Sequence, residues 1–412
     1  SAERFFAHIK AQRAPPEMKQ AVTAVIMLGA GGPSEHEALV HASRRRAAIA
    51  TVEALATLNQ IDRIIVAVPV SERVRWEADR DLAALSGSLL WDVDPPEKPF
   101  HFGRRIGDMA RRLRLQRALY IGAGSMPLLS RKNLAEVVDR LSHAGERWAI
   151  TNNFHSSDWL GLTDATVLPD AATRLPRDNM LGWVLKDKAG FTVQALPPTA
   201  ATQLDIDTPT DLMALRWHPD TPTDLRSFLA QRLPEQPLAR WKAAARVLTT
   251  PGSHVALIGR VSPHTWHVLQ VNTEVWIRVF SEERGMTASG RWGDGRVRSL
   301  LAHFMERSGP KAVFDQLGEM VAAAFIDTRV FLAHHGKWPS AADRYASDLC
   351  QPEKISNARL RSFTEAAITC RAPMVLGAHG AVSGGLYALV ETLQAGTDWL
   401  PDAVQAAATN HR

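Results

Sequence analysis

The first half of the chain alternates short apolar runs with longer stretches of helical pattern. Three apolar runs end at a glycine or a proline, as strands do where they turn into loops: 24–29 (AVIMLG), 64–68 (IIVAV) and 118–122 (ALYIG). Helices are predicted at 44–58, 131–143 and 208–217, and further strands at 148–151 and 192–196. This alternation favours an α/β fold with a doubly wound, mainly parallel sheet. We therefore expect a first domain over residues 20–225.

The second half changes character after a proline-rich stretch. Residues 226–252 place prolines between short helical patches, which predicts a helical linker. From residue 253, three short apolar runs (HVALIGRV, TWHVLQV and EVWIRVF) predict an antiparallel meander. Apolar residues at three-four spacing then predict a long helix over about 310–335, and shorter helices near 341–349, 358–369 and 383–394. The second domain, 253–400, is expected to be α+β and rich in helix.

Composition and charge narrow the function classes. The chain has 412 residues, a formal net charge of +5 and two cysteines. Because the basic residues are dispersed, we expect no nucleic-acid partner. No window approaches the 18–20 apolar residues of a membrane span, so we expect no membrane partner either. The absence of a disulfide framework and of a signal-peptide pattern favours the cytoplasm, and a homo-oligomer is compatible with all of these features.

A glycine-rich turn follows the first predicted strand. Gly29, Gly31 and Gly32 stand in the segment AVIMLGAGGPSE, where a strand becomes a loop. Backbone N–H groups of such a loop can approach a phosphate closely, although glycine turns after strands are also common without a ligand. The spacing matches neither GxGxxG nor GxxxxGK(S/T). A P-loop ATPase and a standard dinucleotide site are therefore disfavoured.

Two further segments carry a resemblance to a known family. Together with the glycine loop, LYIGAGSMPLLS and LDIDTPTDL resemble the GT-A-like nucleotidyltransferases, which include molybdenum-cofactor and phospholactate guanylyltransferases and CMP-sugar synthetases. The resemblance covers about residues 20–217. It implies an Mg²⁺-dependent transferase that moves a nucleotidyl group from a nucleoside triphosphate to a phosphorylated small molecule. Asp207 in the DIDTP segment matches the family's metal-binding, catalytic aspartate.

One family position differs in this sequence. Ser125 stands where the family carries its first metal-binding aspartate, and a serine hydroxyl lacks the charge that a divalent ion prefers. Asp158 is the candidate replacement. Arg45, one of three consecutive arginines, is the candidate catalytic cation, although such a triplet is often a solvated helix face. Asn152 and Asn153 end a predicted strand, where their amides could bind a base or a sugar.

Two alternatives to this enzyme stay open. A nucleotide or nucleotide-sugar binding protein that has lost catalysis, and that regulates or scaffolds, would also explain Ser125. A glycosyltransferase on the same fold would require a DxD motif. Asp92 and Asp94 match that motif in letters, but a turn before the two following prolines is the better explanation.

The second domain offers separate candidates for anion binding. Arg284 and Arg291 belong to an arginine-dense segment and could fork around a phosphate or a carboxylate; a salt-bridged surface loop is the equal alternative. His379 precedes an apolar helix in GAHGAVSGG, which suits an anion at a helix N-terminus. Asp327 and His334 are seven residues apart, so on one helix they could share a metal, although no established metal motif is present.

Overall fold

The computed structural model describes residues 20–77, 89–94, 100–336, 338–396 and 398–400. The chain divides into two compact units, the first drawn from residues 1–32 and 41–205 and the second from 33–40 and 206–412. The sequence placed the end of the first domain at 225 and a linker over 226–252. In the structure, the helices of this region group with the second unit.

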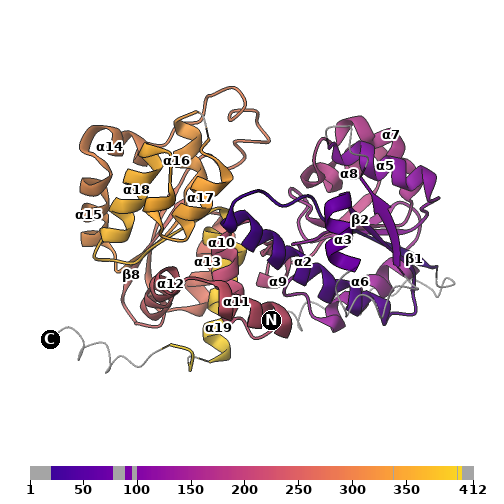
Figure 1. Ribbon diagram of the computed structural model, residues 1–412, viewed down its shortest axis with the longest axis horizontal. Coiled ribbons are helices and arrows are strands. Elements are labelled where there is room, and N and C mark those ends of the chain that lie inside the picture. Colours follow the sequence, from indigo (N-terminus) through magenta and orange to yellow (C-terminus); the bar gives the residue numbers. More distant parts are fainter. Residues whose placement is uncertain (1–19, 78–88, 95–99, 337, 397, 401–412) are drawn as a thin grey trace. The chain divides into compact units, whose positions relative to one another are not determined.

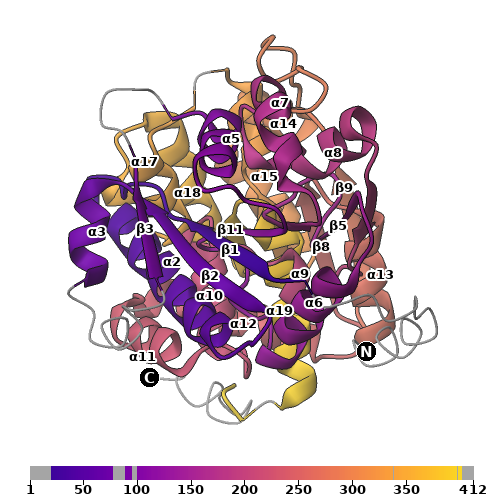
Figure 2. The same ribbon diagram turned by 90° about the vertical axis from the view of Figure 1, so that its right-hand side faces the viewer.

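The first unit is built on a seven-stranded sheet in the order β3-β2-β1-β4-β6-β5-β7. Neighbouring strands pair in parallel except at β6, which is antiparallel to β4 and β5. Figure 2 shows β1, β2 and β3 side by side. The strands are β1 (Val22–Met27), β2 (Ile61–Val68), β3 (Leu89–Val93), β4 (Ala118–Gly122), β5 (Trp148–Thr151), β6 (Trp159–Leu162) and β7 (Thr192–Ala195). The predicted doubly wound, mainly parallel sheet is confirmed.

Helices cover both faces of this sheet, and side chains on successive strand residues supply both cores. In β1, Ala24 and Ile26 join the core under α2 and α6, whereas Val25 joins the opposite core under α5 and α8. The two groups of helices lie on opposite sides of the sheet in Figure 1. The helices are α2 (Glu35–Ala56), α3 (Val70–Glu77), α5 (Phe102–Arg112), α6 (Arg131–His143), α7 (Leu168–Ala171), α8 (Leu181–Ala189) and α9 (Ala200–Gln203).

The second unit contains a four-stranded, all-parallel sheet in the order β11-β10-β8-β9. Its strands are β8 (His254–Gly259), β9 (Trp276–Ser281), β10 (Ala323–Asp327) and β11 (Met374–Gly377). Its helices are α10 (Pro209–Trp217), α11 (Thr223–Arg232), α12 (Glu235–Leu248), α13 (Pro263–Asn272), α14 (Leu300–Ser308), α15 (Pro310–Met320), α16 (Arg329–His334), α17 (Ala341–Asp348), α18 (Ala358–Thr369) and α19 (Gly384–Ala395). A short 3-10 helix, η6 (His379–Val382), precedes α19.

The helix-rich character predicted for the second domain is confirmed, but the antiparallel meander is wrong. The run TWHVLQV forms helix α13, whose N-cap Ser262 accepts from the Thr265 N–H and whose first residue is Pro263. With a helix between them, β8 and β9 pair in parallel. The long helix predicted at 310–335 is also wrong, because β10 separates α15 from α16. Alternating strands and helices make this unit α/β rather than α+β.

Strands β8, β10 and β11 of the second sheet are buried on both faces, whereas the edge strand β9 is largely exposed. Ala256, Ala324 and Met374 belong to a core that also takes residues from α14, α15 and α18. On the opposite face, the Trp241 ring of α12 packs edge-on against Phe325, with 6.3 Å between ring centroids. Burial on both faces explains why β8 and β10 are continuous apolar runs. Among the described helices, none has both the length and the apolar character needed to cross a bilayer.

Candidate functional site

The strand order of the first unit reverses between β1 and β4. The chain passes from β1 to β2 and β3 on one side and then returns to β4 on the other, so the loops that follow β1 and β4 leave adjacent strands. The Ala123 N–H donates to the Met27 C=O at 2.9 Å and joins these loops at their base. In open α/β sheets, ligands bind at the carboxyl ends of strands at such a reversal. This edge is therefore the candidate site of the first unit.

The glycine loop supplies exposed backbone at this edge. Gly29 and Gly31 are exposed and Gly32 is partly buried. A Cβ atom at Gly29 would meet nothing within 4 Å, whereas one at Gly31 would come within 3.0 Å of the His41 ring. A side chain at Gly31 would therefore require the His41 ring to shift, while the open surface at Gly29 leaves room for a ligand to approach the backbone.

Arg45 lies below this loop in a cluster around one buried carboxylate. The Glu72 side chain is only 2% exposed, and its oxygens lie 2.8 Å from His41 Nε2, 2.9 Å from Arg75 Nη1 and 3.8 Å from Arg45 Nη1. Buried charges in proteins are normally paired. Arg45 therefore has a structural partner, and its predicted catalytic role stays a prediction.

Ser125 closes the turn that follows β4. Its side chain is buried, and its hydroxyl donates to the Gly122 C=O at 2.7 Å. The hydroxyl therefore satisfies its own loop and contributes no negative charge at the position that the family resemblance gives to an aspartate.

Asp158 lies at the same edge because β6 runs antiparallel, which brings the start of β6 beside the end of β4. The Gly122 N–H donates to the Asp158 C=O at 3.0 Å. Asn152 Nδ2 donates to Asp158 Oδ2 at 2.8 Å, and the Asp158 N–H donates back to Asn152 Oδ1 at 3.1 Å. The structure thus brings together Ser125, Asn152 and Asp158 in the first unit. Asn153 instead accepts from the His155 N–H, as a turn residue does.

Sequence reasoning missed a buried tyrosine at this edge. Tyr120 is buried in β4, and its hydroxyl donates to Asp178 Oδ2 at 2.7 Å. Burial raises the pKa of Tyr120, and the carboxylates of Asp178, Asp158 and Asp205 raise it further. Three carboxylates therefore act on one buried phenol. Its position inside an apolar strand was the sequence signal that could have found Tyr120.

The DxD letters have a structural explanation. Asp92 Oδ2 lies 2.7 Å from Arg105 Nη1, and Asp94 Oδ1 lies 2.7 Å from Arg105 Nε. Arg112 adds a second guanidinium to Asp92 at 2.9 Å. Both carboxylates therefore attach the end of β3 to α5, which removes the feature that favoured a glycosyltransferase.

Asp207 belongs to the second unit, where it precedes α10. Its N–H donates to Asp211 Oδ2 at 3.0 Å, and its C=O accepts from the Tyr345 hydroxyl at 2.8 Å. Asp211 is buried in the capping box of α10, where burial, and then the charge of Asp207, raise its pKa to about 7. The glycine loop lies in the first unit, so the metal-binding and catalytic role that the resemblance implies for Asp207 stays a prediction.

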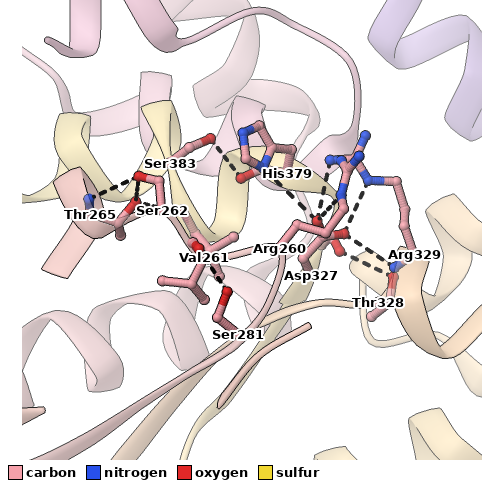
Figure 3. A network of polar contacts seen from close by, with 12 residues as sticks. Arg260, Val261, Ser262, Thr265, Ser281, Asp327, Thr328, Arg329, His379 and Ser383 are labelled. Carbon is pink, nitrogen blue, oxygen red and sulfur yellow. Dashed lines mark hydrogen bonds and ion pairs between the residues drawn. The ribbon is translucent and has the colours of Figure 1, made fainter. Parts of the chain in front are cut away.

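A second group of charged residues lies at the carboxyl edge of the second sheet (Figure 3). Asp327 ends β10, and its side chain is fully buried. Its Oδ2 accepts from Arg260 Nε at 3.0 Å and from Arg329 Nη2 at 3.4 Å, and its Oδ1 accepts from Arg329 Nε at 3.0 Å and from the Arg329 N–H at 3.1 Å. Burial alone would raise the pKa of Asp327, but Arg329 and Arg260 overcome this and lower it below the usual range.

His379, which the sequence offered as a candidate for anion binding, lies at the same edge. Its Nδ1 is 3.9 Å from Asp327 Oδ2, and 47% of its side chain is accessible. Partial burial, and then the guanidiniums of Arg329, Arg260 and Arg284, lower the pKa of His379. Arg284 is therefore close enough to act on this group electrostatically.

Arg291 is placed differently. It forms a bidentate ion pair with Glu283 at 2.6 and 2.9 Å and donates to the Arg296 C=O. This pairing assigns Arg291 to a salt-bridged surface loop rather than to an anion site.

The metal site suggested by Asp327 and His334 is not formed, because Asp327 ends a strand and is held by two arginines. His334 instead meets His303 and Glu306, whose ligand atoms lie within 4.8 Å of one another. However, the Ser299 N–H donates to His334 Nδ1 at 3.1 Å. A neutral histidine that binds a metal through Nε2 needs its proton on Nδ1, so this arrangement favours a His–Glu hydrogen-bond network.

Comparisons with known proteins give likenesses of fold at low identity. No protein-family model and no curated protein matches the sequence. A cytidylyltransferase from Leptospira borgpetersenii is 15% identical, with a TM-score of 0.36, over 52% of this chain and 95% of that one. A CMP:2-keto-3-deoxy-manno-octonic acid synthetase, complexed with CTP, is 13% identical, with a TM-score of 0.31, over 52% and 100%.

A third solved structure is also similar at low sequence identity. The 4-diphosphocytidyl-2C-methyl-D-erythritol synthase from Anaerococcus prevotii is 9% identical, with a TM-score of 0.30, over 43% of this chain and 86% of that one. At these identities and TM-scores, the likenesses assign no function to this chain.

Proposed function

We propose that the first unit binds a nucleoside triphosphate at the reversal between β1 and β4 and transfers its nucleotidyl group to a phosphorylated small molecule. One observation supports this most: the exposed glycine loop lies at the same sheet edge as Ser125, Asn152 and Asp158, which stand at the ends of neighbouring strands. The backbone N–H groups of the loop would bind the phosphates. The motif resemblance points to the same chemistry.

In the proposed reaction, an oxygen of the acceptor's phosphate attacks the α-phosphorus of the triphosphate. The new bond joins that oxygen to the α-phosphorus, the bond from the α-phosphorus to the bridging oxygen breaks, and pyrophosphate leaves. The glycine loop would hold the triphosphate in line, and Asn152 would orient Asp158 through their two hydrogen bonds.

The donor chemistry of this edge fits Mg²⁺. This ion usually takes one or two carboxylates together with phosphate oxygens, and Asp158 and Asp205 both act on Tyr120 here. These two residues would hold the ion. When bound, Mg²⁺ would neutralise negative charge that develops on the phosphates. Asp207, the ligand implied by the resemblance, remains a further candidate.

One observation favours the alternative of a binding protein without catalysis. Ser125 offers no charge, and its hydroxyl is bonded to Gly122. Nucleotidyl transfer and binding without catalysis can be distinguished by measuring ligand binding and turnover on the same protein. A bound ligand at 100 times its Kd stabilises by about 2.7 kcal/mol, which a thermal-shift assay detects.

The test uses the full chain, four nucleoside triphosphates, Mg²⁺ and a panel of sugar phosphates. We expect thermal stabilisation by at least one triphosphate and pyrophosphate release with an acceptor. Asp158→Asn should lower turnover at least tenfold, whereas Asp170→Asn, an exposed aspartate of α7, should behave as the wild type. Binding without pyrophosphate release would support the non-catalytic alternative, and no stabilisation by any triphosphate would contradict the proposed transfer.

A further inference from the structure

The second unit has its own strand-order reversal, and it lies between β8 and β10. The chain goes from β8 to β9 on one side, and β10 and β11 lie on the other. The loop after β8 carries Arg260 and Ser262, and Arg329 begins α16 directly after β10. Gly259 permits this close arrangement, since it has φ +106° and a Cβ there would lie 2.7 Å from the Asp327 C=O. The fold therefore offers a second place where ligands of α/β proteins bind.

Charge at this edge is unbalanced. The guanidiniums of Arg260 and Arg329 are mostly buried, with side chains 17% and 20% exposed, and both pair with the single carboxylate of Asp327. Arg284 adds a third guanidinium that acts on His379, and Asp207 adds a second carboxylate that acts on Arg260. In the direct contacts, two guanidiniums thus share one carboxylate, and an anionic ligand would complete the balance.

Hydrogen-bond donors at this edge are also in excess. Arg260 donates to Asp327 through Nε, and among the described residues its two terminal nitrogens make no hydrogen bond. The N-terminus of α19 follows His379, and its first residues, Ser383, Gly384 and Gly385, are buried. Ser383 donates to the His379 C=O, and no described side chain caps the helix. Gly384 and Gly385 begin this twelve-residue helix, so its first N–H groups are not screened by side chains.

We propose that the second unit binds the phosphate group of a small-molecule phosphate monoester between Arg260, Arg329 and the first turn of α19. The two terminal nitrogens of Arg260 can bind two phosphate oxygens at once, Arg329 adds positive charge while its Nε and Nη2 stay on Asp327, and a helix N-terminus favours an anion. A phosphate has more acceptor oxygens and more charge than a carboxylate, so it matches the donor and charge excess better. The site depends on residues of the second unit alone and does not require the function proposed for the first.

The test is isothermal titration of the full chain with inorganic phosphate, glycerol 3-phosphate and acetate at constant ionic strength. We expect saturable binding of both phosphates and at least tenfold weaker binding of acetate. Arg260→Gln should weaken phosphate binding at least tenfold. The matched control Arg291→Gln removes an arginine of the same unit that is paired with Glu283, and it should change binding less than twofold.

The outcomes separate this site from others on the chain. Binding by Arg260→Gln equal to the wild type would overturn the proposal, because a phosphate held by the first unit would not respond to this change. Equal weakening by Arg260→Gln and Arg291→Gln would show only general attraction to positive charge. If Arg260→Gln fails to fold, Arg284→Gln decides instead: it changes an exposed side chain and should weaken phosphate binding severalfold. Acetate binding as tight as phosphate would overturn the ligand class.

Discussion

Replacing Asp327 by asparagine tests whether the second unit depends on one buried carboxylate. The asparagine keeps the size of the side chain and an oxygen for the two Arg329 bonds to Oδ1. It places an amide where Oδ2 accepts from Arg260 and from Arg329, so donors would face donors there. Each lost charge-assisted bond costs about 1.5–3 kcal/mol. We therefore expect the free energy of unfolding of the second unit to fall by about 3–5 kcal/mol, as for other broken buried pairs.

Urea denaturation at pH 7, followed by hydrogen exchange of peptides that contain β8 and β10, measures this unit by itself. Asp294→Asn is the control, since Asp294 and Arg296 form an exposed pair whose loss costs at most about 1 kcal/mol. The double variant Asp327→Asn with Arg260→Gln should recover part of the lost stability, because it removes one of the two uncompensated cations.

The pH dependence gives a further check. Because the pKa of Asp327 is lowered in the folded protein, its stabilisation is present above the unfolded-state pKa of about 3.9 and is lost as pH falls toward the folded-state value. The difference between wild type and Asp327→Asn should therefore shrink in acid. A difference below about 1 kcal/mol at pH 7, or one that grows as pH falls, would refute the reasoning.

Two further predictions concern the start of α10. Because burial, followed by the charge of Asp207, raises the pKa of Asp211 to about 7, its contribution to stability is complete below about pH 3.8 and is lost as pH rises to 7. This loss amounts to roughly 4 kcal/mol. Asp211→Asn should remove it, so that the melting temperature of the variant varies less between pH 4 and pH 8 than that of the wild type. At Gly380, a Cβ would lie 1.8 Å from Asp211 Oδ1, so Gly380→Ala should lower the free energy of unfolding by about 3 kcal/mol. Gly145→Ala is the control: a Cβ there meets nothing within 4 Å, so the free energy of unfolding should change by less than about 0.5 kcal/mol. Urea denaturation measures both variants, and similar losses of stability in the two would contradict the packing argument.

Local sequence signals determined many of the elements. The strands at 118–122 and 148–151 and the helices at 131–143 and 358–369 have the predicted bounds. The two helices begin behind Ser130 and Asn357, whose side chains accept hydrogen bonds from the first turn. Such caps and periodic patterns act within a few residues, so they can be recognised without knowing the partner of each element.

Other elements were ambiguous because a short apolar run suits either a strand or a buried helix. The runs at 263–272 and 321–327 were assigned the wrong type, although Ser262 and Pro263 carried a helix-start signal for the first of them. Strand β6, at 159–162, was not predicted at all, and its antiparallel direction is what places Asp158 beside Gly122. Strand direction is decided by pairing across the sheet, which local sequence does not specify.

The sequence by itself determined the parallel sheet of the first unit, the glycine loop at its edge and the residues Asp158 and Asn152 as candidates. Only the tertiary structure decided which charges meet. Arg260 and Asp327 are 67 residues apart along the chain, and they come into contact because β8 and β10 are neighbours in the second sheet. A hydrophobic pattern fixes which face of each strand is buried, but the order of strands in a sheet follows from packing of the whole unit. For this reason the arginine pair at the second reversal was found in the fold and not in the sequence.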